Sequence, residues 1–329
     1  MDRRAFIRAV GFGLLTAPLG AEAQRAGRVY RLGMLFPTTP PFPGDQRTTA
    51  ILIPPALREL GYVEGQNLVI ERRYAEGKLE RLPGLTRELV QLRVDVIVAV
   101  SAAAIRAARD ATATIPIVMY SNLDPVAAGF VASLARPGGN LTGVLIAPGG
   151  TLAAKKLELL KAAVPGAARI ALLAPADPNF GRQVQEVQTA ALSLGVTLVV
   201  VEVREGGYDR AFATIAAERP GALFVGAHSS FMRHRKRIIE LAAKHRLPAI
   251  YEWPEQVEDG GLMAYGTSLS ALSRRIAVYV DRIFKGAKPG DLPVEQPTTF
   301  ELAINLKTAK ALGLTIPPSL LLGAGRVIE

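Results

Sequence analysis

The sequence contains one short pattern twice, as Thr114-Ile115-Pro116-Ile117-Val118-Met119-Tyr120 and as Arg246-Leu247-Pro248-Ala249-Ile250-Tyr251. Each copy follows a segment with helical periodicity, places a proline where a strand would begin, and continues as a short apolar run. Proline is tolerated at the first residue of a strand, because the missing N–H matters least there. The repetition predicts two halves of similar plan.

Short apolar runs alternate with helix-period segments along most of the chain, which is typical of parallel sheets covered by helices. The predicted strands are 31–36, 68–74, 95–100 and 117–120 in the first half, and 169–174, 197–203, 222–225 and 249–251 in the second. The predicted helices are 48–60, 80–92 and 102–111, then 151–163, 180–194, 208–217 and 231–245. The pattern predicts an α/β protein with two doubly wound lobes.

The carboxyl-terminal part is too short for a third domain. It contains a predicted strand at 262–265, a helix at 269–285, and a strand and helix within 299–312. These elements must join the existing lobes, so several segments must pass between them. We expect residues 28–143 and 253–288 to form the first lobe, and residues 144–252 and 289–329 to form the second.

The amino terminus has the features of a signal peptide. The paired arginines Arg3-Arg4 precede an uncharged stretch at 9–20, and Ala21-Glu22-Ala23 is a small-residue cleavage site. We expect cleavage after Ala23, following export by either the Sec or the twin-arginine route. The apolar stretch is too short to span a bilayer, which needs about 20 residues. Because the chain has no cysteine for a disulfide or a lipid anchor, the expected location is the periplasm.

The formal net charge of +10 does not by itself indicate nucleic-acid binding. The basic residues are spread along the chain, and no basic motif is interleaved with aromatic residues. The one dense run, Arg233-His234-Arg235-Lys236-Arg237, opens an amphipathic segment. We interpret it as a solvated helix face, with docking to an acidic partner or a membrane surface as the alternative.

The sequence lacks the common catalytic and metal-binding patterns. It has no cysteine nucleophile, P-loop, G-x-G-x-x-G fingerprint or G-x-S-x-G elbow. Its three histidines do not have metal-ligand spacing, so we expect neither a metal nor a cofactor. His228 beside Ser229 most resembles a catalytic pair, but adjacency does not provide the geometry that a nucleophile and its base require. We expect a binding protein rather than an enzyme; a hydrolase and a ligand-sensing signalling protein are the alternatives.

A set of motifs follows in order along the chain: Gly61-Tyr62-Val63-Glu64-Gly65-Gln66-Asn67, Arg81-Leu82-Pro83, Val94-Asp95-Val96-Ile97-Val98, Asp124-Pro125-Val126, the run 133–143, Gly260-Gly261-Leu262-Met263-Ala264-Tyr265-Gly266 and the run 292–313. These motifs resemble the ABC transporter substrate-binding protein family that is related to tryptophan- and tyrosine-binding importer components. The resemblance implies a type I periplasmic-binding-protein fold, with two Rossmann-like lobes, three interlobe crossovers and a small molecule trapped on closure. It also implies delivery to ABC permease subunits; we expect a monomer that meets the membrane only through them.

Open parallel sheets bind ligands beyond the carboxyl ends of their strands, so the loops after the strands are the candidate site. These loops are 36–38, 101–102, 121–124, 176–180, 228–230 and 251–253. The candidate ligand-binding residues are Phe36, Ser101, Ala102, Tyr120, Asn122, Asp124, Asp177, His228, Tyr251, Trp253 and Tyr265.

The residue types in these loops suit an aromatic amino acid. The rings of Tyr120, Tyr251, Trp253 and Tyr265 could together sandwich a planar ligand. Asp124 could take an ammonium group, and the helix that begins after Ser101 could take a carboxylate. The alternatives are structural: Asp124 and Asp177 each precede a proline and could only cap helices, and the rings could be core.

The sequence departs from the family pattern at one place that bears on the identity of the ligand. Many relatives carry Gly-Thr-Pro where this chain has Ser101-Ala102-Ala103, which puts the relatives' ligand in doubt here. A branched amino acid, a purine-like compound and an aromatic carboxylate therefore also remain candidates.

Overall fold

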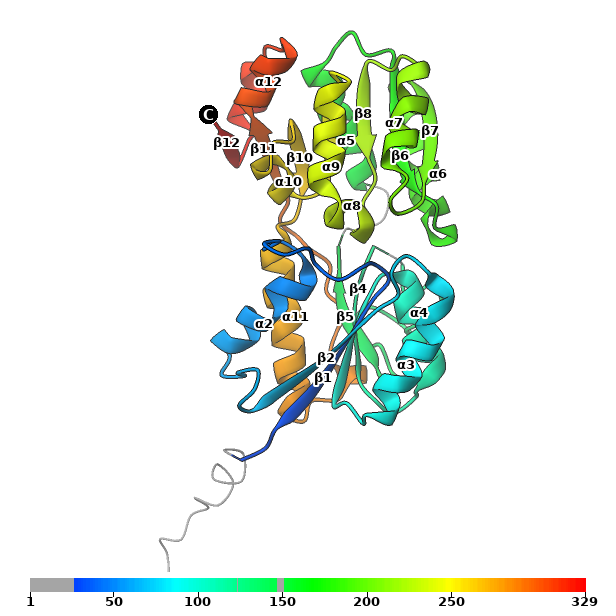
Figure 1. Ribbon diagram of the computed structural model, residues 1–329, viewed down its shortest axis with the longest axis vertical. Coiled ribbons are helices and arrows are strands. Elements are labelled where there is room, and N and C mark those ends of the chain that lie inside the picture. The colour runs from blue at the N-terminus through cyan, green and yellow to red at the C-terminus, as the bar shows by residue number, and fades with distance from the viewer. Residues whose placement is uncertain (1–26, 123, 147–150) are drawn as a thin grey trace, which may run out of the picture.

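The chain folds into two α/β lobes, each built around its own sheet (Figure 1). The computed structural model describes residues 27–122, 124–146 and 151–329. The sheet of the first lobe has the order β2-β1-β3-β4-β5, and all of its strand pairs are parallel. Its strands are β1 (Tyr30–Phe36), β2 (Leu68–Tyr74), β3 (Val96–Val100), β4 (Ile117–Ser121) and β5 (Leu141–Leu145).

Helices cover both faces of the first sheet (Figure 1). Successive side chains of its strands point to opposite faces, and because both sets are apolar, both faces must be buried. Leu32 of β1 belongs to the core formed with α2 (Thr49–Glu59) and α11 (Leu269–Phe284). Leu35 of the same strand belongs to the core on the opposite face. That face is covered by the short helix η1 (Leu79–Arg81), α3 (Leu82–Gln91) and α4 (Ala102–Ala111).

The second lobe contains a seven-stranded sheet in the order β12-β11-β10-β9-β8-β6-β7. Among its pairs, β10 and β11 are antiparallel and the others are parallel. The strands are β6 (Arg169–Pro175), β7 (Thr197–Val203), β8 (Ala222–Val225), β9 (Ala249–Tyr251), β10 (Met263–Gly266), β11 (Glu301–Asn305) and β12 (Arg326–Ile328).

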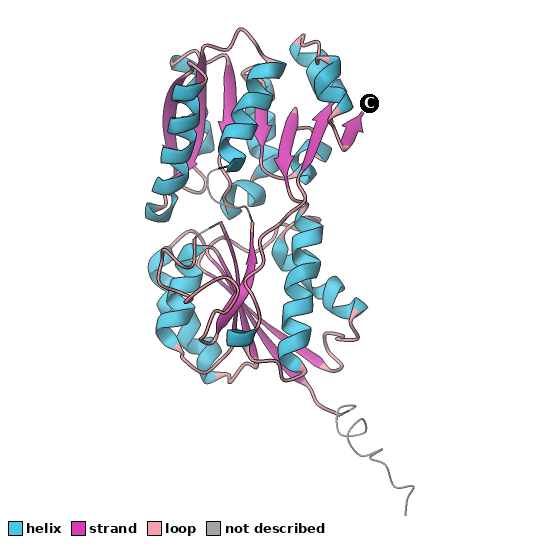
Figure 2. Ribbon diagram, turned by 180° about the vertical axis from the view of Figure 1, so that it is seen from behind, coloured by secondary structure: helices cyan, strands magenta, loops and turns pink. Residues whose placement is uncertain are grey.

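Helices lie on both faces of this sheet as well (Figure 2). They are α5 (Thr151–Ala163), η2 (Pro178–Phe180), α6 (Gly181–Ser193), α7 (Tyr208–Ala217), α8 (Ser229–Arg233), α9 (Arg235–Lys244), α10 (Pro254–Glu258), α12 (Leu306–Leu312) and α13 (Pro318–Leu322). The short helix η3 (Pro289–Asp291) lies beside β5 of the first lobe instead. None of the helices in the described part of the chain has both the length and the apolar character needed to cross a bilayer.

The repeated proline pattern has the same structural role in both lobes. Pro116 precedes β4 and accepts a hydrogen bond from Ile97 of β3 at 2.9 Å. Pro248 precedes β9 and accepts one from Leu223 of β8 at 2.8 Å. Each proline lacks a donor, but its carbonyl starts the pairing with the neighbouring strand. The prediction of two halves of similar plan is confirmed.

The chain passes between the two sheets three times, which is the number of crossovers that the resemblance implies. The chain passes from β5 to α5, from β10 to α11, and from Glu295, which bridges to Val144 of β5, to β11. The expected lobe division placed 253–288 in the first lobe. The sheets divide this segment: α10 and β10 pack with the second sheet, because Met263 and Ala264 pair with Ile250 and Tyr251 of β9, and only α11 returns to the first lobe.

Candidate ligand-binding site

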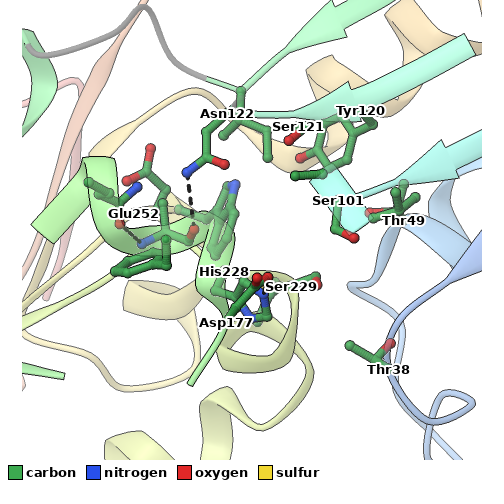
Figure 3. A pocket seen from close by; sticks show the side chains of 18 of the residues that line it. Thr38, Thr49, Ser101, Tyr120, Ser121, Asn122, Asp177, His228, Ser229 and Glu252 are labelled. Carbon is green, nitrogen blue, oxygen red and sulfur yellow. Dashed lines mark hydrogen bonds and ion pairs between the residues drawn. The ribbon is translucent and has the colours of Figure 1, made fainter. Parts of the chain in front are cut away.

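A cavity of about 320 Å³ lies between the lobes, and we call it the interlobe cavity. Its walls come from the loops after β1, β3 and β4 in the first lobe and after β6, β8 and β9 in the second, together with α5 and α6. Figure 3 shows Thr38, Thr49 and Ser101 on one side of the cavity and Asp177, His228 and Ser229 on the other. The cavity has the size and the position expected of a small-molecule site in open parallel sheets.

Most of the residues predicted from the sequence line this cavity. They are Phe36, Ser101, Ala102, Tyr120, Asn122, Asp124, Asp177, His228 and Trp253. Tyr251 and Tyr265 do not line it. Tyr251 is 1% exposed and belongs to the core beneath α7 and α9, while Tyr265 packs against the opposite core and beside Phe300. Their side chains point to the faces of the sheet rather than beyond its edge, so the predicted sandwich of four rings does not form.

The aromatic part of the cavity combines the predicted Phe36, Tyr120 and Trp253 with Tyr74, Phe180 and Phe224, which were not among the candidate residues. Phe36 and Tyr74 stack with their centroids 5.0 Å apart, and Phe180 and Phe224 contribute from the second lobe. Trp253 lines the cavity and is also 2% exposed within the first lobe's core. Tyr120 is 3% exposed; burial, with the charges of Glu255 and Glu252, raises the pKa of its hydroxyl well above the usual value.

The amino-terminal end of α4 opens onto the cavity at Ser101. The Ser101 hydroxyl accepts a hydrogen bond from the Ala104 N–H at 3.4 Å and so caps the helix. Its backbone has φ 90° and ψ 158°, a conformation that is essentially reserved for glycine. The helix terminus supplies partial positive charge to the cavity, which suits a carboxylate.

Asp124 has a structural role in this arrangement. One of its oxygens accepts hydrogen bonds from the N–H groups of Val126 and Ala127, both at 3.0 Å, and the other lies 3.2 Å from Arg182 of α6. The Ala127 hydrogen bond and the Arg182 contact lower the pKa of this carboxyl in spite of partial burial. Asp124 therefore caps a turn at 125–129 rather than the predicted helix, and its pair with Arg182 also links the two lobes.

His228 caps α8 and does not activate a serine at the cavity. Its Nδ1 accepts a hydrogen bond from the Ser230 N–H at 3.2 Å and lies 2.7 Å from the Ser230 hydroxyl. Its Nε2 lies 3.4 Å from Asp177. Ser230 is 6% exposed and is not among the residues that line the cavity, whereas Ser229 lines it without contacting His228 through a hydrogen bond. A substrate in the cavity would not reach the one hydroxyl that the histidine contacts.

A buried ion pair between Lys156 and Glu252 was not predicted. Lys156 lies on α5 and Glu252 follows β9; both line the cavity, with side-chain exposures of 3% and 2%. The Lys156 ammonium also lies 4.7 Å from the centroid of the Phe224 ring. Glu252 belongs to a predicted loop, but nothing in the amphipathic pattern of 151–163 distinguishes Lys156 from a solvent-exposed lysine.

A cluster of charges joins the lobes beside the cavity, and we call it the interlobe ion cluster: Asp45, Arg47, Arg233, Arg235 and Asp259. Asp45, in the loop between β1 and α2, lies 2.8 Å from Arg235 and 3.6 Å from Arg233. Asp45 and both of these arginines are nearly fully buried. The prediction of a solvated face for the run 233–237 is therefore wrong for Arg233 and Arg235, because the β1–α2 loop of the other lobe covers them.

Two lobes of mostly parallel sheet, three connections and a cavity between the lobes define a binding protein of the type I periplasmic fold. The family model described as "ABC transporter substrate binding protein" matches residues 50–328. The chain belongs to this family, and it is the substrate-binding protein of an ABC transporter. Members of the family are substrate-binding proteins rather than enzymes, and they act outside the cytoplasmic membrane.

Individual relatives agree with this assignment. The chain is 26% identical over 260 residues to a tyrosine-binding protein of Clostridioides difficile strain R20291, covering 79% of this chain and 74% of the relative. A conserved domain protein of Vibrio cholerae has a TM-score of 0.80 and 25% identity, over 91% of this chain and all of that one. The ABC domain of a Streptococcus pneumonia protein in complex with L-Trp has a TM-score of 0.78 and 26% identity, with the same coverage.

Proposed function

We propose that the protein captures an aromatic amino acid or a close analogue in the interlobe cavity and delivers it unchanged to its permease. The observation that carries this proposal is the composition of the cavity wall: Phe36, Tyr74, Tyr120 and Trp253 provide aromatic surface beside the amino-terminal end of α4. Relatives described as tyrosine-binding and as a complex with L-Trp support the same ligand class.

Binding without turnover is part of the proposal. The cavity holds no accessible histidine-activated hydroxyl among the described residues, since the Ser230 hydroxyl is buried away from it. The two ion pairs between the lobes, Asp124 with Arg182 and Asp45 with Arg235, instead suit a clamp that closes over its ligand. Neither the site nor the relatives favour a signalling or hydrolytic role.

Thermal denaturation with a ligand panel tests the proposal. Ligand at a hundredfold excess over its dissociation constant stabilises the native state by about 2.7 kcal/mol. For a protein of this size that corresponds to an increase in Tm of about 4 °C. Tryptophan, tyrosine and phenylalanine should produce this shift; leucine, purines and aromatic carboxylates should produce less. If only non-aromatic compounds raise the Tm, the aromatic ligand class is wrong while the binding-protein assignment is retained.

We also propose that the protein is exported to the periplasm as a monomer that begins at Gln24. The support is the sequence of residues 1–23, which lie outside the described part of the chain. Amino-terminal sequencing of the protein from an osmotic-shock fraction should give Gln24 as the first residue. An intact Met1 on a membrane-bound protein would contradict the proposal.

A further inference from the structure

Glu252 differs from the other carboxylates that line the interlobe cavity in having an oxygen without a partner. Its Oε2 pairs with the Lys156 ammonium, whereas its Oε1 has no hydrogen-bond partner among the described residues. The residue is 2% exposed and lines the interlobe cavity. A buried carboxylate oxygen in this condition destabilises the structure until a donor reaches it.

The remaining carboxylates of the cavity already have partners. Both oxygens of Asp124 are occupied, by the N–H groups of Val126 and Ala127 and by Arg182. Asp177 faces His228, and Glu186 pairs with Arg182 near the edge of α6. Within the described chain, Glu252 is therefore the lining carboxylate best prepared to accept a donor from a ligand.

Lys156 holds the Glu252 carboxylate in place. The ammonium binds Oε2 and lies against the face of Phe224, so the carboxylate group cannot rotate without breaking this ion pair. Gly266, where β10 ends, leaves the necessary space: a Cβ atom there would lie 2.0 Å from the Glu252 carbonyl oxygen and 3.4 Å from Oε1. Lys156 is thus a positioning residue, and Glu252 is the residue that would contact a ligand.

We propose that Glu252 is a specificity-determining residue that accepts a hydrogen bond from the ammonium group of the ligand through Oε1. This inference rests on the proposed function, and it replaces Asp124 by Glu252 as the acceptor. It restricts the ligand to molecules that carry a cationic or neutral N–H donor in addition to an aromatic ring. Aromatic carboxylates without such a donor would leave Oε1 buried and unpaired, and they would bind more weakly.

The test compares each amino acid with its deaminated analogue by isothermal titration calorimetry. The probes are L-tryptophan with 3-(indol-3-yl)propionate, and L-tyrosine with 3-(4-hydroxyphenyl)propionate. The wild-type protein should prefer the amino acids by at least about tenfold, as expected for a hydrogen bond to a charged group. Glu252→Gln should remove most of this preference by weakening amino acid binding, and it should change the affinity for the deaminated probes by less than about twofold.

Stability controls separate specificity from folding. Glu252→Gln leaves the Lys156 ammonium buried without a counter-charge, which lowers the Tm. The double variant Lys156→Met with Glu252→Gln removes both charges and should recover the Tm but not the preference for amino acids. Glu158→Gln, an exposed carboxylate on α5 that pairs with Lys155, should behave as wild type in both measurements.

Three outcomes would overturn the inference: a wild-type protein without preference for the amino acids, a Glu252→Gln variant that keeps the preference, or an equal loss of affinity for both members of each pair. A wild-type protein that binds none of the four probes would instead contradict the aromatic ligand class, and the inference would fail with it.

Discussion

The Nη2 atom of Arg235 lies 2.8 Å from the Oδ1 atom of Asp45, although the two residues belong to different lobes. Arg235 also pairs with Asp259 at 2.5 Å, and its side chain is 3% exposed. The contact between the lobes at this point is thus a buried ionic network rather than a set of solvated surface pairs. Removing one member of a buried pair is strongly destabilising, which makes the network a determinant of how easily the lobes separate.

Asp45→Asn should favour separation of the lobes. Arg233 and Arg235 lose their partner in the other lobe, and both regain water when the lobes part, so opening is expected rather than unfolding. The radius of gyration of the ligand-free protein should increase in solution scattering, and ligand affinity should decrease by about tenfold because less of the protein is closed. Asp209→Asn, which removes an exposed pair with Arg237, is the matched control and should change neither. An unchanged radius in Asp45→Asn would show that the cluster does not hold the lobes together.

Closure should depend on pH only in the acid range. Burial alone would raise the pKa of the Asp45 carboxyl, but the hydrogen bond and charge of Arg235 and the Arg47 N–H outweigh burial, so the pKa lies below 3.8. A group with a lowered pKa in the closed form contributes its full stabilisation above its usual pKa and loses it as pH falls through the lowered value. Scattering should therefore show a constant radius from about pH 5 to 8 and opening below about pH 4. A midpoint between about pH 6 and 7 would indicate a histidine instead.

Intrinsic fluorescence should report ligand binding directly. Trp253 is the single tryptophan of the chain, is 2% exposed and lines the interlobe cavity. Titration with L-phenylalanine or L-tyrosine should change its emission in a saturable way, and Trp253→Phe should abolish the tryptophan signal. Because the ring is both core and cavity wall, Trp253→Ala should lower the unfolding free energy by about 3 to 5 kcal/mol and also weaken binding. Loss of stability with unchanged affinity would show that ligand does not contact this ring.

Ser101 offers a test of backbone strain at the cavity. Its φ of 90° is suited to glycine, so Ser101→Gly should relieve backbone strain of about 1 to 3 kcal/mol. Loss of the hydroxyl cap should cost only a few tenths of a kcal/mol, so the variant should be more stable than the wild type. Ser101→Ala keeps the strain and loses the cap, and should destabilise by about 1 kcal/mol. Denaturant unfolding of the two variants measures the difference. Equal destabilisation by both would mean that the backbone at this position is not strained.

Much of the fold could be predicted because its strands and helices have clear periodicity. The helices at 102–111, 151–163 and 208–217 begin and end where expected. β5 was not predicted, because it directly follows Pro137-Gly138-Gly139-Asn140, a segment typical of a loop, and contains Gly143. That glycine is required by tertiary packing: a Cβ atom would lie 2.3 Å from the Met119 carbonyl oxygen of β4. The predicted helix 231–245 is divided at His234 between α8 and α9.

Site residues could be predicted when their position at a strand end places them in the cavity. They were missed when contact with a residue far away in the sequence places them there. Phe36 and Ser101 lie in the cavity because they stand at strand ends. Whether Tyr251 points into the cavity or into the core depends on which face of β9 it occupies, and the sequence does not specify this. Lys156 meets Glu252 across 96 positions of sequence, a contact that no local pattern indicates.

The return of α11 to the first lobe determines when that lobe can be completed during synthesis. Phe284 of α11 stacks on Tyr30 with ring centroids 4.3 Å apart, and Asp281 accepts a hydrogen bond from the Tyr62 hydroxyl at 2.9 Å. A nascent chain that has reached only β10 has made every strand of the first sheet, but one face of that sheet is covered by α2 alone and lacks α11. Most of the polypeptide must therefore emerge from the ribosome before the amino-terminal lobe is complete, so chaperones meet an incompletely folded chain for most of its translation.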